Sequence, residues 1–266
     1  MSRLRYKDKI TLTGGTRGIG KGCVEIFVEN GAQVAFCSND EEEGKHTERD
    51  LNSRGPGVSW FIYGDVTKEP DIKNIVEKTI EKYGRLDCLI NNVGTHPPPH
   101  PIDEFSAEDF RKLIDLNVVS YFLFSKYALP HLRKTEGSII NISSLVGNIG
   151  QGQAVTYCAT KGAITSMTKA LAIDEAKYNV RVNSISPSNI WTPLFDSYLK
   201  TCPESEEVKK GFENNQLLGR FGTIQEVGHA CLFLAADATF CTGIELNLSA
   251  GAELNYANKN MRSTTS

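Results

Sequence analysis

The chain has 266 residues, a formal net charge of −3 and 40% hydrophobic residues, a composition typical of globular proteins. Because nucleic-acid binding needs a basic surplus or stripe, this charge balance argues against that function. No apolar run approaches the roughly 18–20 residues that a membrane-spanning helix requires, and the polar N-terminus lacks the apolar segment of a secretory signal. We therefore expect a cytoplasmic protein with no nucleic-acid or membrane partner.

The seven cysteines are scattered along the chain and never form a Cys-x-x-Cys pair. Most of them lie in apolar segments, where a free thiol acts as a small hydrophobic side chain. Their spacing therefore favours reduced thiols and predicts neither a metal site nor a disulfide.

Short β-branched runs alternate with longer amphipathic stretches along the chain. In chain order, the runs predict strands at Ile10–Thr13, Gln33–Cys37, Val58–Tyr63, Cys88–Asn91, Ser138–Ile142, Arg181–Ile185 and Glu245–Leu248. The amphipathic stretches predict helices at Asp71–Tyr83, Phe110–Leu132, Thr156–Lys177 and Gln225–Ala235. Thr67, Ser106 and Thr223 are the predicted helix N-caps.

Strands that are apolar on both faces and separated by helices indicate a parallel sheet covered on both sides. The predicted fold class is therefore α/β, with a doubly wound, Rossmann-like sheet. No linker or repeat divides the chain, so we predict a single domain over residues 1–266, with its core at about 9–254. The long mixed segment at about 187–219 predicts a substrate lid, and residues 257–266 predict a terminal tail.

A glycine-rich turn follows the first predicted strand and opens a helix. In it, Gly14, Gly18 and Gly20 form the pattern G-x-x-x-G-x-G. Glycines allow a tight turn with positive φ and let a pyrophosphate approach the backbone, and the N–H groups at a helix start favour an anion. A purely structural turn is the alternative, but the position between strand and helix favours a dinucleotide site.

Two further polar segments lie where predicted strands end. Asp65-Val66 follows one strand, and Asn91-Asn92-Val93-Gly94 ends another. Because ligands bind at the carboxyl ends of parallel strands, both segments favour a nucleotide crevice. The alternatives, an N-cap for Asp65 and a simple turn for Asn91 and Asn92, stay open.

Ser144, Tyr157 and Lys161 form the sharpest candidate for a catalytic site. Tyr157 and Lys161 are four residues apart in a predicted helix and so share a face, and Ser144 follows the strand before it. A free phenol has a pKa of about 10, which is too high for efficient proton exchange near pH 7. We expect the Lys161 ammonium and an oxidised nicotinamide to lower the pKa of Tyr157, and Ser144 to hydrogen-bond the substrate oxygen.

Asn117 lies in the predicted helix that precedes Ser144. Its amide could hold a water molecule through which Lys161 exchanges protons with solvent. The alternative is that Asn117 is an ordinary polar helix residue.

Taken in order, Thr13-Gly14-x-x-x-Gly18-x-Gly20, Asp65-Val66, Asn91-Asn92-x-Gly94, Asn117, Ser144 and Tyr157-x-x-x-Lys161 resemble the short-chain dehydrogenase/reductase family. The match extends from about Lys9 to Leu254. It implies hydride transfer between NAD(P) and a secondary alcohol or ketone. The coenzyme contacts that we expect are Gly14, Arg17, Gly18, Ile19, Gly20, Ser38, Asp65, Val66, Asn92, Gly94, Tyr157, Lys161, Pro187, Ile190 and Thr192.

Within that family, four segments are similar to the type-14 17β-hydroxysteroid dehydrogenases. They are His96–Pro99, Asn141–Gly147, Asn189–Leu194 and Phe240–Leu246. This resemblance implies NAD-dependent oxidation of the 17β-hydroxyl of a steroid such as estradiol, by a homotetramer. The substrate contacts that it implies are His96, Ser144, Gln151, Tyr157, Trp191 and Tyr256.

Four of these substrate residues also have structural interpretations. His96 precedes three prolines and fits an ordinary loop, while Trp191 fits packing inside the lid. Gln151 and Tyr256 fit a surface or an interface between subunits.

The end of the second strand departs from the family pattern. Members that prefer NAD carry an acidic residue there for the adenosine 2′-hydroxyl, whereas this chain has Ser38. Serine tolerates the 2′-phosphate of NADP, and Arg17 could pair with that phosphate. Asp40 to Glu43 add negative charge nearby. The resemblance therefore favours NAD, but the local chemistry leaves NADP open.

Two glycine positions of the family are also changed. Ser188 follows Pro187 where a glycine is usual, and Ser249-Ala250-Gly251 replaces a turn richer in glycine. If position 188 has a positive φ, a serine there costs about 1 kcal/mol or more. We expect both changes to affect activity without removing a catalytic group.

Three functions fit these observations. The first is an alcohol or ketone oxidoreductase with a steroid substrate, which the apolar lid residues Trp191, Leu194 and Phe195 favour. The second is a reductase of 3-oxoacyl or sugar-like substrates, which a polar lid would favour. The third is a catalytically idle nucleotide-binding scaffold, against which the intact Ser144, Tyr157 and Lys161 argue.

Overall fold

The computed structural model describes residues 4–254. Each predicted strand is present, and together they form a seven-stranded sheet of order β3-β2-β1-β4-β5-β6-β7 in which neighbours are parallel. The strands are β1 (Ile10–Gly14), β2 (Gln33–Ser38), β3 (Val58–Tyr63), β4 (Cys88–Asn91), β5 (Ser138–Ile142), β6 (Arg181–Pro187) and β7 (Glu245–Leu248). The strand order reverses between β1 and β4, and ligands bind at such a switch point.

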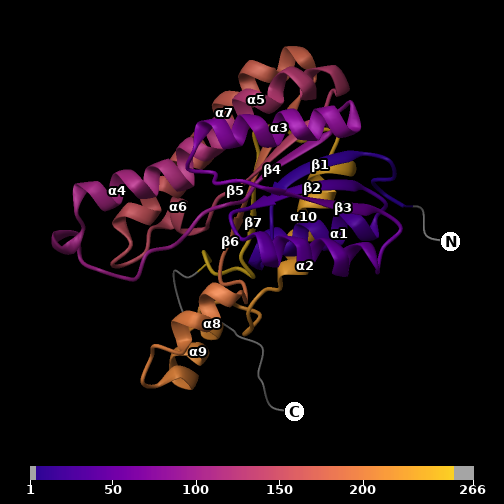
Figure 1. The fold of residues 1–266 in the computed structure, drawn as a ribbon. Helices are drawn as coiled ribbons and strands as arrows, with labels where there is room; N and C mark the ends of the chain where they lie inside the picture. The colour runs from indigo at the N-terminus through magenta and orange to yellow at the C-terminus, as the bar shows by residue number, and fades with distance from the viewer. Residues whose placement is uncertain (1–3, 255–266) are drawn as a thin grey trace.

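Helices cover both faces of the sheet (Figure 1). They are α1 (Gly18–Glu29), α2 (Glu41–Asn52), α3 (Glu69–Tyr83), α4 (Ala107–Ile114), α5 (Ser120–Thr135), α6 (Val146–Ile149), α7 (Val155–Glu175), α8 (Pro193–Leu199), α9 (Ser205–Asn214) and α10 (Ile224–Ala236). Side chains of α1, α2 and α10 build the core on one face, and those of α3, α5 and α7 build it on the other. Burial on both faces explains why the strands are apolar throughout.

The helix predicted at Phe110–Leu132 is instead two α-helices, α4 and α5. A π-helical turn, Asp115–Val119, separates them, and the Ser120 N–H donates to the Asp115 carbonyl across it. Periodicity did not reveal this turn because a single turn is too short to show in an apolar pattern. Such turns are frequent at functional sites.

Two of the three predicted N-caps are confirmed. The Ser106 hydroxyl accepts from Asp109 N at 3.0 Å, and Thr223 forms a capping box with Glu226. The prediction for Thr67 is wrong, because α3 begins one residue later and its N-cap is Lys68. Thr67 instead donates through Oγ1 to the Asp65 carboxylate at 2.7 Å.

The segment predicted as a lid contains α8 and α9, which project below the sheet in Figure 1. Between residues 4 and 254 no helix is long and apolar enough to cross a membrane. Over the same range, no group of three or more His, Cys, Asp or Glu side chains is arranged to hold a metal ion.

Candidate active site

The glycine-rich turn between β1 and α1 is packed too closely for side chains. A Cβ atom at Gly20 would lie 2.1 Å from the Gly14 carbonyl oxygen, and one at Gly14 would lie 2.0 Å from Val93 Cγ2. Gly18 has a left-handed φ of +54°, which favours glycine. Arg17, the N-cap of α1, makes no side-chain capping bond, so the helix start remains suited to an anion.

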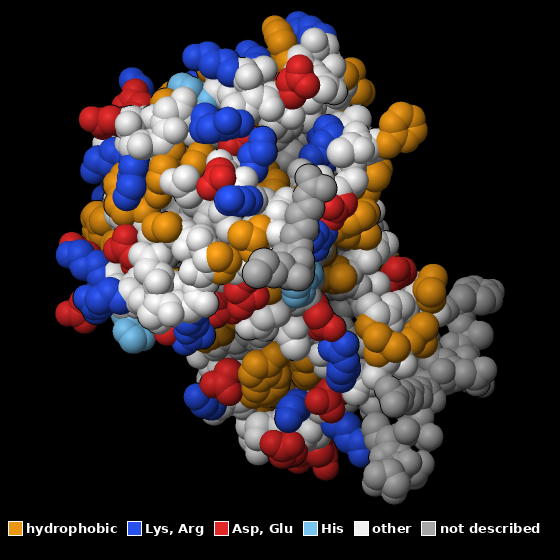
Figure 2. All heavy atoms as spheres, turned by 90° about the vertical axis from the view of Figure 1, so that its right-hand side faces the viewer, with side chains coloured by type: hydrophobic (Ala, Val, Ile, Leu, Met, Phe, Trp, Pro, Cys, Tyr) orange, Lys and Arg blue, Asp and Glu red, His pale blue; other side chains and the backbone are white. Residues whose placement is uncertain are grey.

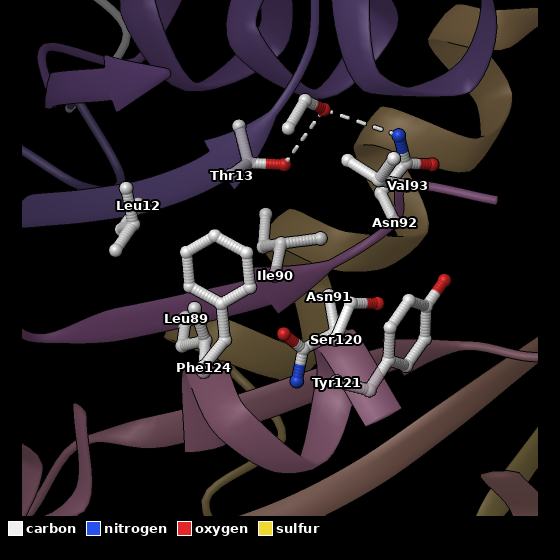
Figure 3. Close-up of a pocket in the computed structure, with 11 residues that line it drawn as sticks. Leu12, Thr13, Leu89, Ile90, Asn91, Asn92, Val93, Ser120, Tyr121 and Phe124 are labelled. Carbon is white, nitrogen blue, oxygen red and sulfur yellow. Dashed lines mark hydrogen bonds between the residues drawn. The ribbon is translucent and has the colours of Figure 1, made fainter. Parts of the chain in front are cut away.

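Asn92 connects the end of β4 to this turn. Its Nδ2 donates to the Gly14 carbonyl at 3.1 Å, as the dashed line in Figure 3 shows. Beneath it, Asn91 Nδ2 donates to Asn141 Oδ1 at 2.8 Å and so links β4 to β5. The cavity drawn in Figure 3 has a volume of about 10 Å³, which fits about one water molecule. A dinucleotide therefore has to lie outside it, along the strand ends.

Asp65 and Val66 lie at the carboxyl end of β3, as predicted. Hydrogen bonds from the Thr67 side chain and backbone lower the pKa of Asp65. Val66 is buried in the core. Gly94, which follows β4, lets the backbone lie close to the Asn117 side chain, because a Cβ there would lie 3.0 Å from Asn117 Oδ1.

Ser144, Tyr157 and Lys161 are brought together at the ends of β5 and α7. The Ser144 side chain hydrogen-bonds to Tyr157. Lys161 is only 4% exposed, and its Nζ donates to the Ile142 carbonyl at 2.8 Å. The same Nζ lies 5.8 Å from the centre of the Tyr157 ring. The predicted grouping of these three side chains is therefore present.

Burial shifts the pKa values of this group in opposite directions. It raises the pKa of Tyr157 to about 12, although the Ser144 hydrogen bond acts in the opposite sense. It lowers the pKa of Lys161 to about 8. The expectation that Lys161 and an oxidised nicotinamide together lower the pKa of Tyr157 stays a prediction. In the protein alone, the Lys161 ammonium donates to the Ile142 carbonyl, and desolvation dominates the pKa of Tyr157.

Asn117 is fully buried in the π-helical turn. Its Oδ1 accepts from Thr95 N at 3.0 Å, and its Nδ2 donates to the Thr95 carbonyl at 2.9 Å and to Thr160 Oγ1 at 3.2 Å. Sequence reasoning missed Thr95 and Thr160. The available signal was that Thr160 lies three residues after Tyr157 in α7 and so shares its face of the helix.

His96 lies beside Tyr157, with the two ring centres 4.2 Å apart. Its Nδ1 is 2.6 Å from the Pro97 carbonyl, and because a carbonyl only accepts, Nδ1 carries the proton. Its Nε2, which is then an acceptor, lies 3.3 Å from the side-chain amide of Gln151, whose NH2 group is the donor once the amide is turned to face the ring. His96 and Gln151 therefore form a polar pair next to the Tyr157 ring, and their contact with the substrate stays a prediction.

The lid is held together by five aromatic side chains. They are Trp191, Phe195, Tyr198, Phe212 and Phe221. Trp191 packs edge-on against Phe221 at 5.3 Å yet remains 39% exposed, and the neighbouring Leu194 is 55% exposed. Figure 2 shows hydrophobic side chains among charged ones on the lower projection of the molecule. Trp191 thus supports the lid and also offers a free surface.

The start of the lid lies against the glycine-rich turn. The Thr192 methyl group is 3.5 Å from where a Cβ of Gly18 would be, and Thr192 also caps α8. Ile190 pairs with Gly222. The Pro187 carbonyl at the end of β6 accepts from Leu145 N at 2.9 Å. Thr192 therefore lies at the glycine-rich turn, and Ile19 is partly buried against the core. The coenzyme contacts of Pro187, Ile190 and Thr192 stay predictions. Tyr256 and the predicted tail lie outside the described residues.

A model of the family described as enoyl-(acyl carrier protein) reductase matches residues 14–253. An L-fucose dehydrogenase of Bos taurus is 53% identical over 96% of this chain and 93% of its own length. The chain belongs to the short-chain dehydrogenase/reductase family.

Solved structures of the family share the fold. Levodione reductase superimposes with a TM-score of 0.90 at 25% identity, over 94% of this chain and 100% of its own. The aldohexose dehydrogenase of Thermoplasma acidophilum superimposes with a TM-score of 0.85 at 28% identity, over 100% of this chain and 99% of its own. The α/β, Rossmann-like prediction is therefore confirmed, and the chain is an NAD(P)-dependent short-chain oxidoreductase.

The finer resemblance to type-14 17β-hydroxysteroid dehydrogenases needs correction. The similar protein of Bos taurus is named L-fucose dehydrogenase, which favours the sugar alternative over the steroid. Two of the segments behind the steroid resemblance are part of the framework. Ile142 in Asn141–Gly147 holds Lys161, and Phe240–Leu246 leads into β7. Similarity in such segments reflects a shared catalytic and structural framework more than a shared substrate.

The turn, the strand ends and the buried Lys161 fit a nicotinamide dinucleotide. At the adenosine end, Ser38 Oγ accepts from Thr16 Oγ1 at 3.3 Å and from Asp40 N at 3.1 Å. Arg17, which we expected to be available for a 2′-phosphate, instead forms an ion pair with Asp40. Ser38 and Arg17 thus lie where predicted, but both are engaged by the protein.

The condition for strain at Ser188, a positive φ, is not met. Among residues 4–254, Ser188 does not have a left-handed φ, whereas Ala250 does, at +50°. Ser188 Oγ donates to the Ser249 carbonyl at 3.0 Å and contacts the buried Gln216. The two changed glycine positions therefore meet in one polar connection at the base of the lid, and the strain lies at Ala250.

Proposed function

We propose that the protein is a sugar dehydrogenase that oxidises a hydroxyl of L-fucose or a closely related 6-deoxyhexose. The observation that carries this proposal is the 53% identity, over nearly the whole chain, to an L-fucose dehydrogenase. The close grouping of Ser144, Tyr157 and Lys161 supports it, because a scaffold without activity has no need of a buried lysine beside a phenol.

In the proposed reaction, Ser144 donates a hydrogen bond to the substrate oxygen and holds it beside Tyr157. Tyr157 takes the hydroxyl proton as the C–O bond becomes a carbonyl. Bound NAD(P)⁺ supplies the hydride acceptor for the hydrogen on carbon, and its positive charge favours the phenolate. Lys161 then returns the proton to solvent through a water held at Asn117. Two electrons leave with the hydride, and one proton is released.

The surroundings of Tyr157 suit a sugar with one methyl group. His96 and Gln151 present polar atoms that can exchange hydrogen bonds with hydroxyls. In the lid, the partly exposed Trp191 and Leu194 are the apolar surface that we expect to cover the methyl group and the C–H face of the ring. A few polar groups in an otherwise apolar site fix the orientation of the substrate, which hydride transfer requires.

The test is a substrate panel with purified protein. L-fucose, D-fucose, cyclopentanol and estradiol are each supplied with NAD⁺ or NADP⁺, and reduced nicotinamide is followed by absorbance. We expect L-fucose to give the highest kcat/KM. Its kcat/KM should exceed that of its mirror image, D-fucose, by at least about tenfold, because a protein site is chiral and holds its hydrogen-bonding groups in fixed positions. Identification of the product by NMR distinguishes a lactone, from the anomeric hydroxyl, from a ketone.

A steroid is the second candidate, because the exposed apolar surface of Trp191 and Leu194 also fits a flat hydrophobic ring. Estradiol oxidation faster than that of L-fucose would establish this alternative and overturn the sugar proposal. A protein that binds coenzyme but oxidises none of the four compounds would contradict both.

A further inference from the structure

Two charged side chains meet at the end of β2. Arg17 and Asp40 form an ion pair, and their side chains are 62% and 37% exposed. Asp40 lies two residues beyond Ser38, the last residue of β2. In this fold the adenosine ribose is bound at that strand end. The pair is therefore close to the group in which NAD and NADP differ.

Asp40 is fixed in place from two sides. Its Oδ1 accepts from Glu43 N at 3.1 Å, which makes Asp40 the N-cap of α2. Its Oδ2 bonds to Arg17. An exposed ion pair alone contributes little to stability, but the capping bond holds this carboxylate at the strand end whether or not Arg17 stays bound.

The charge around Asp40 is strongly negative. Asp40, Glu41, Glu42 and Glu43 are consecutive, and the nearby Lys45 pairs with Glu41 at 2.6 Å. Arg17 is the cation of the glycine-rich turn, and Asp40 neutralises it. A 2′-phosphate brings further negative charge to this place, whereas a 2′-hydroxyl brings none.

We propose that this protein selects NAD over NADP through Asp40, which occupies Arg17 and repels a 2′-phosphate although Ser38 itself tolerates one. The selecting carboxylate thus comes from the N-cap of α2 instead of the last residue of β2. Ser38 is neutral, and its hydroxyl accepts from the Asp40 backbone and so shapes the turn that presents Asp40. The inference rests on the proposed function only in that the site binds a nicotinamide dinucleotide.

The test measures binding of NAD⁺ and NADP⁺ by calorimetry, without any alcohol substrate. We compare the unchanged protein with Asp40→Asn, Asp40→Asn/Arg17→Ala and Glu42→Gln. Asparagine is as good an N-cap as aspartate, so Asp40→Asn keeps α2. Glu42→Gln removes the same charge from an exposed position of α2 and is the matched control.

We expect the unchanged protein to bind NAD⁺ at least about tenfold more tightly than NADP⁺. Asp40→Asn is expected to tighten NADP⁺ binding by about tenfold and to change NAD⁺ binding by less than about threefold. The added Arg17→Ala substitution should remove most of that gain. Glu42→Gln should change the affinity for NADP⁺ by less than about threefold.

Tighter NADP⁺ binding by the unchanged protein would overturn the proposal. Equal effects of Asp40→Asn and Glu42→Gln would also overturn it, because general charge would then explain the preference. Neither result depends on which alcohol is oxidised, so a failure here is distinct from a failure of the sugar assignment.

Discussion

The coenzyme side of the site and the lid are built in different ways. On the coenzyme side, backbone atoms approach so closely that Gly14 and Gly20 have no room for a Cβ, and Lys161 is held inside the core. In the lid, aromatic rings pack against one another while Trp191 stays 39% exposed. We therefore expect the chemistry to depend on the closely packed coenzyme side and the choice of substrate to depend on the lid.

The attachment of the two regions shows the same contrast. The coenzyme side continues directly from buried strands. The lid joins the sheet through a polar connection in which Ser188 contacts Ser249 and Gln216. Substitutions on the coenzyme side should therefore remove activity, whereas substitutions in the lid should tune it.

Lys161→Met should have the largest effect. We expect kcat/KM to fall by about a thousandfold, while stability at pH 7 rises by about 2 kcal/mol. Burial lowers the pKa of Lys161 from 10.5 to about 8, so the buried cation costs stability fully below pH 8. This cost declines as pH rises from about 8 to 10.5. Denaturant unfolding at pH 7 and pH 10 measures it, and a variant less stable than the parent at pH 7 would contradict it.

Gly20→Ala should weaken NAD⁺ binding by at least about a hundredfold, because the new methyl group displaces the Gly14 carbonyl from the turn. Gly152→Ala is the control, since a Cβ there meets nothing within 4 Å. Calorimetric titration of both variants checks the effect. Similar affinities for the two would show that the turn is not tightly constrained.

Trp191→Ala should raise KM for the alcohol by about tenfold through loss of its exposed ring surface. We expect kcat and the affinity for coenzyme to change by less than about threefold. Tyr178→Ala is the control, because Tyr178 is also 39% exposed but lies outside the lid. A fall in kcat with unchanged KM would assign Trp191 to the fixed part of the site.

Ser188→Gly and Ala250→Gly should have the smallest effects, with opposite signs. Ser188→Gly should lower the free energy of unfolding by about 1 kcal/mol, because it removes the hydrogen bonds of the hydroxyl. Ala250→Gly should raise it by about 0.5 kcal/mol, because Ala250 has a φ of +50°. Chemical denaturation compares the two. Stabilisation by Ser188→Gly would place the strain at Ser188 after all.

The parallel sheet and the place of the glycine-rich turn could be predicted from the sequence because both depend on local patterns. Apolar runs mark the strands, and the glycine spacing marks the turn. The pairing of Arg17 with Asp40 could not be predicted, since it depends on the path of the chain after β2. The π-helical turn at Asn117 was equally hidden, because it spans a single turn, which is too short to show in an apolar pattern.

Substrate choice was the weakest part of the prediction. The resemblance to steroid dehydrogenases used segments such as Asn141–Gly147, which support Lys161. The polar pair of His96 and Gln151 is formed by two loops that are distant in the sequence. The polar surroundings that this pair gives Tyr157 are evident only in the folded structure, where His96 lies against the Tyr157 ring.

The most direct test of the account compares Tyr157→Phe with the parent on the best substrate of the panel, between pH 6 and pH 10. Because burial raises the pKa of Tyr157 to about 12, the parent should oxidise faster as the pH rises and the phenol more readily loses its proton. We expect the variant to retain coenzyme affinity and to lose at least about a thousandfold in kcat/KM at every pH. A phenylalanine variant that keeps the parent's rate and pH dependence would contradict the assignment of Tyr157 as the proton acceptor.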